Sequence, residues 1–86
     1  DVGSWDAWAE HSDADEDGNM IRGDTIVLDS KNCVICSEHR LIAVLGVKDL
    51  VVIDSGDALL ICPRQRVQDV KRVVEELGKR GRHELI

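Results

Sequence analysis

The chain has 86 residues, a formal net charge of −6, two Trp and neither Phe nor Tyr. This length allows one small domain, whose core must be built from aliphatic side chains. Residues 1–60 carry 13 acidic and 4 basic residues, and such an acidic body argues against nucleic-acid binding as the main role. The sequence has no apolar stretch of about 18 residues, which excludes a transmembrane helix within it.

The N-terminal segment predicts a short helix from Trp5 to about His11. Ser4 is a good N-cap residue, and Asp6 suits the first turn of a helix. Trp5 and Trp8 are three residues apart and would share one helix face, where we expect them to anchor the helix on a core. Ligand stacking is the alternative role for these two side chains. The chain begins without Met or a signal-peptide pattern, so we expect a fragment of a longer protein.

An acidic loop follows at residues 12–24. Asp13, Asp15 and Asp17 precede Gly18, as in the first half of a calcium-binding loop, and Asp24 stands at its twelfth position. An EF-hand prefers Glu at that position and a helix after it, whereas here a strand is predicted from Thr25. We therefore interpret these residues as a solvent-exposed loop and keep calcium binding as the alternative.

Five short apolar runs between residues 25 and 62 dominate the sequence. They are TIVL from Thr25, CVIC from Cys33, LIAVL from Leu41, LVVI from Leu50 and ALLIC from Ala58. Their starts are 8, 8, 9 and 8 residues apart. Runs rich in Val, Ile and Leu, separated by polar turns at a short fixed spacing, predict strands in a stacked coil, a sandwich or a small barrel.

The two central runs, LIAVL and LVVI, are apolar at every position. A strand of this kind is expected to be covered on both faces. One helix could cover only part of that surface, so we expect the chain to form a homodimer, with Val44 and Val52 at the interface.

Three cysteines stand among these runs, at positions 33, 36 and 62. Cys33 and Cys36 form a C-x-x-C pair with His39 nearby, but residues three apart on a strand point to opposite faces. We interpret the cysteines as small buried hydrophobic residues, with a metal site as the alternative. Their odd number fits a reducing cytoplasm.

The C-terminal part predicts an amphipathic helix from about Arg66 to Lys79. Its apolar positions follow the helical spacing and are Val67, Val70, Val73, Val74 and Leu77. Gly78 and Gly81 mark its end. The polar face mixes both charge signs, which favours packing on the strands over lying on a membrane surface.

From D-V-G-S-W at Asp1 onward, the sequence resembles the mannose-1-phosphate guanylyltransferases over nearly its whole length. The resemblance includes RGDTIVLDSKN from Arg22, SEHRLIAVLGVKDLVVIDSGDALLIC from Ser37 and RVQDVKRVVEELGKRGRHEL from Arg66. It implies a mainly β fold, a left-handed β-helix-like stack of short strands with a short N-terminal and an amphipathic C-terminal helix. Residues 1–24 would end the nucleotidyltransferase domain, 25–63 would form the repeats and 64–86 the C-terminal helix.

The family makes GDP-mannose and pyrophosphate from GTP and mannose 1-phosphate, and its Gly-rich nucleotide-binding signature is missing here. The resemblance therefore implies a structural or oligomerisation segment that is not catalytic alone, with itself and an upstream nucleotidyltransferase domain as partners. Asp1 corresponds to a Mg²⁺-binding carboxylate of the intact enzyme, and no cofactor is expected for the segment. The alternative is an autonomous binding module for a divalent cation or a nucleotide sugar.

Overall fold

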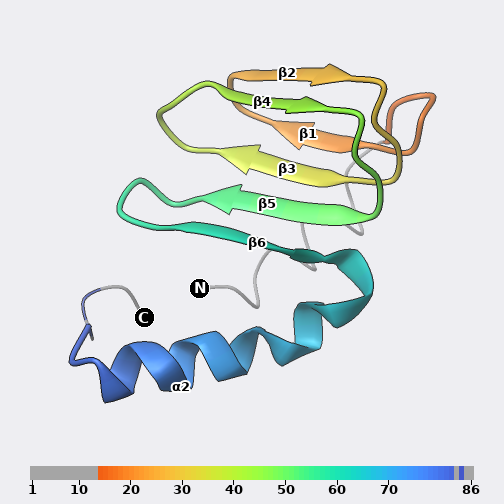
Figure 1. The fold of residues 1–86 in the computed structure, drawn as a ribbon. Coiled ribbons are helices and arrows are strands. Elements are labelled where there is room, and N and C mark those ends of the chain that lie inside the picture. The colour runs from red at the N-terminus through yellow and green to blue at the C-terminus, as the bar shows by residue number, and fades with distance from the viewer. Residues whose placement is uncertain (1–13, 83, 85–86) are drawn as a thin grey trace.

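The computed structural model describes residues 14–82 and 84 (Figure 1). Each of the five predicted runs forms a strand, with bounds shifted by one residue at most at either end, and one further strand precedes them. Two helical segments follow the strands. The elements are β1 (Met20–Arg22), β2 (Thr25–Leu28), β3 (Val34–Ser37), β4 (Ile42–Leu45), β5 (Leu50–Asp54), β6 (Leu59–Pro63), the 3-10 helix η1 (Arg64–Val70) and α2 (Lys71–Lys79).

The strands form two sheets, and the chain alternates between them. Sheet A has the order β1-β3-β5-β6 and sheet B the order β2-β4. All neighbours are parallel except β5 and β6, which are antiparallel. Successive strands from β1 to β5 belong alternately to sheet A and sheet B, so the chain winds as a coil through these five strands. It then turns back along β6 (Figure 1). The mainly β, β-helix-like stack predicted from the sequence is confirmed.

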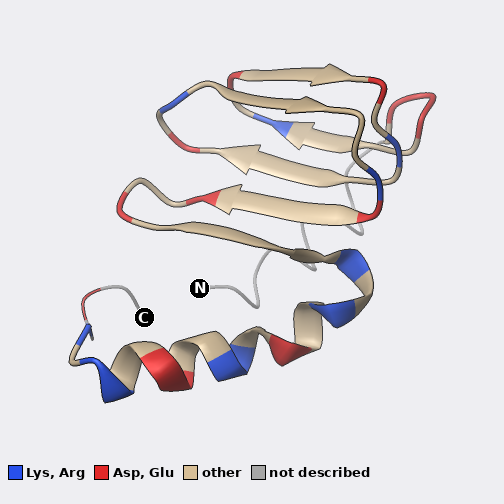
Figure 2. Ribbon diagram, viewed as in Figure 1, with Lys and Arg blue, Asp and Glu red and all other residues tan. Residues whose placement is uncertain are grey.

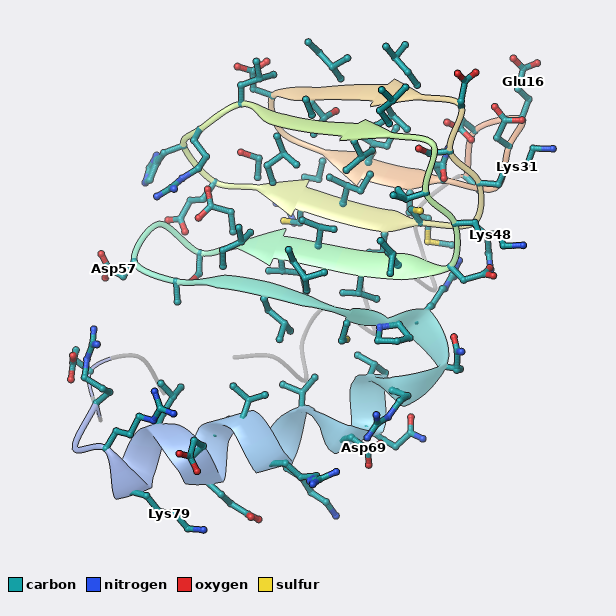
Figure 3. All side chains as sticks on the ribbon, in the orientation of Figure 1. Glu16, Lys31, Lys48, Asp57, Asp69 and Lys79 are labelled. Atoms are coloured by element: carbon teal, nitrogen blue, oxygen red, sulfur yellow. The ribbon has the colours of Figure 1, made fainter. Side chains whose placement is uncertain are left out.

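One turn of this coil takes 17 residues through most of its length. Thr25 pairs with Ile42 and Val34 with Val51. Lys31 and Lys48 lie in the connections from sheet B to sheet A and pair with each other in a single parallel bridge. This bridge is a third side of the coil, only one residue long in each turn. Figure 3 shows both lysine side chains pointing outward at the same end of the strands. The spacing of about eight residues between the apolar runs is thus half a turn.

The corners repeat with the same period and use left-handed backbone. Asn32 and Asp49, one turn apart, have φ values of 56° and 57°, and Gly18 has 78° at the equivalent corner of the first turn. Asn and Asp tolerate this conformation better than most residues with a side chain. Asn32 Nδ2 donates a hydrogen bond of 2.6 Å to Asp49 Oδ1, which ties two successive corners together.

The core lies between the inner faces of the two sheets. Its buried apolar residues are Cys33, Ile35, Ile42 and Val52, against which Val27, Val44, Val47 and Leu50 pack. Side chains along a strand point alternately to opposite faces, so Val34 and Val51 belong to the outer face of sheet A. Both are completely buried. The prediction of two-sided cover is therefore confirmed for β5, whereas on β4 the outer residues Ala43 and Leu45 are exposed.

Two boundaries differ from the prediction. The coil begins before Thr25, because β1 pairs with β3 in sheet A; its three residues MIR are too short to give a strand signal. The C-terminal helix begins irregularly as the 3-10 helix η1, within which Arg66 departs from helical backbone with φ −109° and ψ 16°. The regular α-helix starts only at Lys71. The helix predicted for residues 5–11 lies outside the described residues.

Candidate interaction surface

The outer face of sheet B is apolar and open to solvent. It carries Ile26 and Leu28 on β2 and their pairing partners Ala43 and Leu45 on β4. Leu28 is 55% exposed and Leu45 is 69% exposed. Figure 2 shows that Asp, Glu, Lys and Arg gather in the turns and on the helical segments, while β2 and β4 carry none. We call Ile26, Leu28, Ala43 and Leu45 the sheet B face.

The open end of the coil adds to this apolar surface. Sheet A continues past β5 to β6, whereas the two strands of sheet B end at β4. Ile61 pairs with the core residue Val52 and shares its inner face, yet it is exposed, as is Leu59 on the same face of β6. The last strand of sheet A therefore presents its inner face without a strand of sheet B above it.

Val44 and Val52, the dimer-interface residues predicted from the sequence, both face the core, and the interface itself stays a prediction. Val52 is only 6% exposed and belongs to the core, and Val44 packs against that core from β4. Both runs are apolar at every position, so their composition did not tell the inner face from the outer one. The alternation of Ile42 and Val44 inward with Ala43 and Leu45 outward assigns the exposed set instead.

The acidic loop forms a hydrogen-bonded corner. Asp15 Oδ1 accepts hydrogen bonds of 2.9 Å from the backbone N–H groups of Asp17 and Asn19. The bond from Asn19 is the main cause that lowers the pKa of Asp15 below its ordinary value. The buried Asn19 side chain then donates from Nδ2 to Ser30 O and accepts at Oδ1 from Cys33 N, both at 2.9 Å.

This geometry accounts for the acidic loop without a cation. Asp15 is occupied by backbone donors, Asp24 lies in the turn between β1 and β2, and Asp13 is outside the described residues. In the part of the chain that the structure describes, no three His, Cys, Asp or Glu side chains are grouped to hold a metal ion. Calcium binding by the D-x-D-x-D-G spacing stays an untested alternative.

The cysteines are separated by the fold. Cys33 lies in the core, where its thiol donates a hydrogen bond to Lys31 O with an Sγ–O distance of 3.3 Å. Cys36 follows Ile35 on β3 and points to the outer face, as the spacing predicted. Cys62 lies on β6, and all three thiols are free. Burial raises the pKa of the Cys62 thiol, opposed in part by the charge of Arg66.

Sequence reasoning missed an ion pair between the exposed Arg40 and the buried Asp54, at the end of the strands away from the Lys31 and Lys48 corner. Asp54, at the end of β5, has a completely buried side chain whose Oδ2 lies 2.9 Å from Arg40 Nε. Its Oδ1 accepts a hydrogen bond of 2.9 Å from Gly56 N, and Arg40 Nη2 donates to Gly56 O at 3.2 Å. The pair joins the β3–β4 turn to the β5–β6 turn. The one sequence feature that could have indicated this pair is the Asp that ends the otherwise apolar run LVVID.

The coil, its corners and its C-terminal helix define a β-helix domain. The family described as the MannoseP isomerase/GMP-like beta-helix domain matches residues 23–77. The chain belongs to this family.

Its relatives are mannose-1-phosphate guanylyltransferases. The chain is 48% identical over 84 residues to the mannose-1-phosphate guanylyltransferase of Klebsiella pneumoniae and 45% identical over 84 residues to a putative one of Vibrio cholerae, with 98% of this chain and 18% of each relative covered. A crystal structure described as mannose-1-phosphate geranyltransferase from Thermus thermophilus superposes with a TM-score of 0.72 at 33% identity, covering 90% of this chain and 24% of that one.

The chain thus spans about a fifth of the length of the relatives that it matches. Asp1, the Mg²⁺ ligand implied by resemblance, lies outside the described residues, and its role stays a prediction for the intact enzyme. Among the described helices, none has the length and apolar character needed to cross a bilayer.

Proposed function

We propose that this chain is the C-terminal structural and self-association segment of a mannose-1-phosphate guanylyltransferase. Such an enzyme would join GTP and mannose 1-phosphate to give GDP-mannose and pyrophosphate. The names of the relatives and the match to their β-helix domain support this parent activity. The segment itself would supply a rigid coil that holds copies of the enzyme together, with the chemistry performed by an upstream domain.

The observation that carries the self-association proposal is the exposed sheet B face. Soluble monomers rarely leave contiguous apolar surface uncovered, and such surface usually marks an interface. Leu28 and Leu45 pair side by side at the C-terminal ends of the two strands and are more than half exposed. A two-fold axis through this face would bury the same side chains on both copies, so one surface would suffice for a closed dimer.

Sedimentation equilibrium at micromolar concentration tests this proposal. We expect the wild-type chain to sediment at about twice its 9.5 kDa mass. Leu45→Glu places a charge in the face and should give the monomer mass with an unchanged circular dichroism spectrum. Val73→Glu, an equivalent change at a 45% exposed position of α2, should remain dimeric and serves as the control. A wild-type chain that sediments as a monomer throughout this range would refute the proposal.

A second assay addresses catalysis. The sequence has no Gly-rich phosphate loop, so we propose that the 86-residue chain does not form GDP-mannose alone. Incubation with GTP, mannose 1-phosphate and Mg²⁺ should release no pyrophosphate above background. Release above background would show that the segment contributes chemistry.

The alternative role, an autonomous module for a divalent cation or a nucleotide sugar, predicts a different result. Calorimetric titration of the chain with Ca²⁺, Mg²⁺ or GDP-mannose would then give saturable heat. No feature of the described residues favours this role over the structural one.

A further inference from the structure

A groove lies between β6 and the two helical segments. Its volume is about 730 Å³, with Leu60 and Cys62 on the strand side and Val70, Val73 and Leu77 on the helical side. Leu60 and Cys62 pair with Ile53 and Val51, so the groove continues the outer face of sheet A. Figure 1 shows α2 running alongside β6 below the sheet.

The helix α2 does not fill this groove. It contains no buried residue, although its apolar side chains follow one face. Val73 is 45% exposed, and Val74 and Leu77 are only half-buried. An amphipathic helix in a globular domain normally buries its apolar face. The apolar wall formed by Val73 and Leu77 is therefore available to another element.

We infer that this groove is the docking site of the chain's own N-terminal segment, residues 1–13, and that Trp5 and Trp8 are its anchors. Trp5 and Trp8 are the only aromatic residues of the chain. Spaced three apart, they fit one face of a short helix, and each indole would bury about 150–250 Å² of surface. The groove provides the aliphatic walls that such side chains need.

Length and charge support this occupant. Trp8 and Trp5 lie six and nine residues before Ala14, so an extended connection spans up to about 20 Å to the first and about 30 Å to the second. The segment carries four acidic and no Lys or Arg residues. On the groove rim, Arg66 and Arg80 are paired with Asp69 and Glu76, whereas Arg72 has no ion-pair partner among the described residues. Arg72 is thus placed to receive a carboxylate of the segment.

Docking would connect the D-V-G-S-W motif directly to the coil. Asp1 lies four residues before Trp5, so anchoring the tryptophans fixes the position of this end of the upstream domain relative to sheet A. This inference does not rest on self-association, because the groove and the sheet B face are formed by different residues.

Tryptophan fluorescence of the full 86-residue chain tests the inference. With no other Trp and no Tyr, all emission reports on residues 5 and 8. We expect a blue-shifted emission maximum and weak quenching by acrylamide in the wild type. Val73→Glu should shift the maximum to the red and raise the quenching constant toward the value of the urea-unfolded chain, while circular dichroism shows a retained fold.

Leu45→Glu is the matched control, since it introduces the same charge on the sheet B face. It should leave emission and quenching unchanged even where it abolishes dimerisation. A second readout uses Cys62 in a Cys36→Ser background, where Trp5→Ala with Trp8→Ala should speed alkylation of the thiol. Wild-type emission equal to that of the unfolded chain would overturn the inference. Equal shifts in the Val73→Glu and Leu45→Glu variants would also overturn it.

Discussion

Sheet A and sheet B are built from the same kind of sequence but are covered differently. β4 in sheet B is apolar at every position, and β5 in sheet A is apolar at every position before its last residue, Asp54. Val51 on the outer face of sheet A is completely buried, whereas Leu45 on the outer face of sheet B is 69% exposed. An all-apolar strand thus indicates that both faces need cover, but it does not say whether the cover comes from the same chain.

The largest difference between the two faces should appear on truncation of their aliphatic side chains. Ile35→Ala removes a completely buried side chain from the core and should lower the free energy of unfolding by about 2–5 kcal/mol. Ile26→Ala, at a 45% exposed position of the sheet B face, should change it by about 0.5 kcal/mol or less when both are measured in the monomeric Leu45→Glu background. Urea unfolding provides the measurement. Similar losses for the two variants would contradict the assignment of inner and outer faces.

The ion pair between Arg40 and the buried Asp54 sharpens the comparison at the turns of sheet A. Asp54→Ala removes the acceptor of Gly56 N–H and the partner of Arg40. We expect a loss of about 1–3 kcal/mol in the free energy of unfolding. Asp57→Ala, in the exposed β5–β6 turn seen in Figure 3, is the control and should stay within about 0.5 kcal/mol of wild type. An Asp54→Ala variant as stable as the control would show that the pair does not hold these turns together.

Two glycines at corners of the coil separate backbone strain from crowding. Gly46 has φ +67° and open space around an added Cβ, so Gly46→Ala should cost about 1 kcal/mol from left-handed backbone alone. Gly23 has φ +92°, and an added Cβ would collide with the backbone carbonyl of Ser37 on the neighbouring turn. Gly23→Ala should therefore lower the melting temperature further than Gly46→Ala. The reverse order would mean that the first turn is more loosely packed than described.

The smallest effect concerns the acidic corner. Backbone hydrogen bonding from Asn19 lowers the pKa of Asp15, so the ionised carboxylate is favoured in the folded state. Its contribution is present above the pKa of the unfolded chain and is lost as the pH falls through the lower pKa of the folded state. Asp15→Ala should consequently flatten the decline in stability on acidification, measured by thermal unfolding between neutral and strongly acidic pH. An unchanged pH profile would show that this corner does not couple to folding.

The sequence predicted the strands well because each is a short aliphatic run bounded by turn residues. It did not predict β1, since Met20–Arg22 is held by pairing with β3 rather than by its own composition. The helix was found from its spacing, but the irregular backbone at Arg66 was not, because it depends on the turn from β6. The inward direction of Val44 could not be predicted for a related reason. Val44 and Leu45 have the same hydrophobic character, and only the register with β2 decides which of them faces the core.

The central claim is that the sheet B face is covered by a second copy of the chain. Its most direct test is the melting temperature as a function of protein concentration, since association of folded chains makes that temperature concentration-dependent. We expect the melting temperature of the wild type to rise with concentration across the micromolar range, and that of Leu45→Glu to stay constant. A wild-type melting temperature that does not change with concentration would contradict the claim.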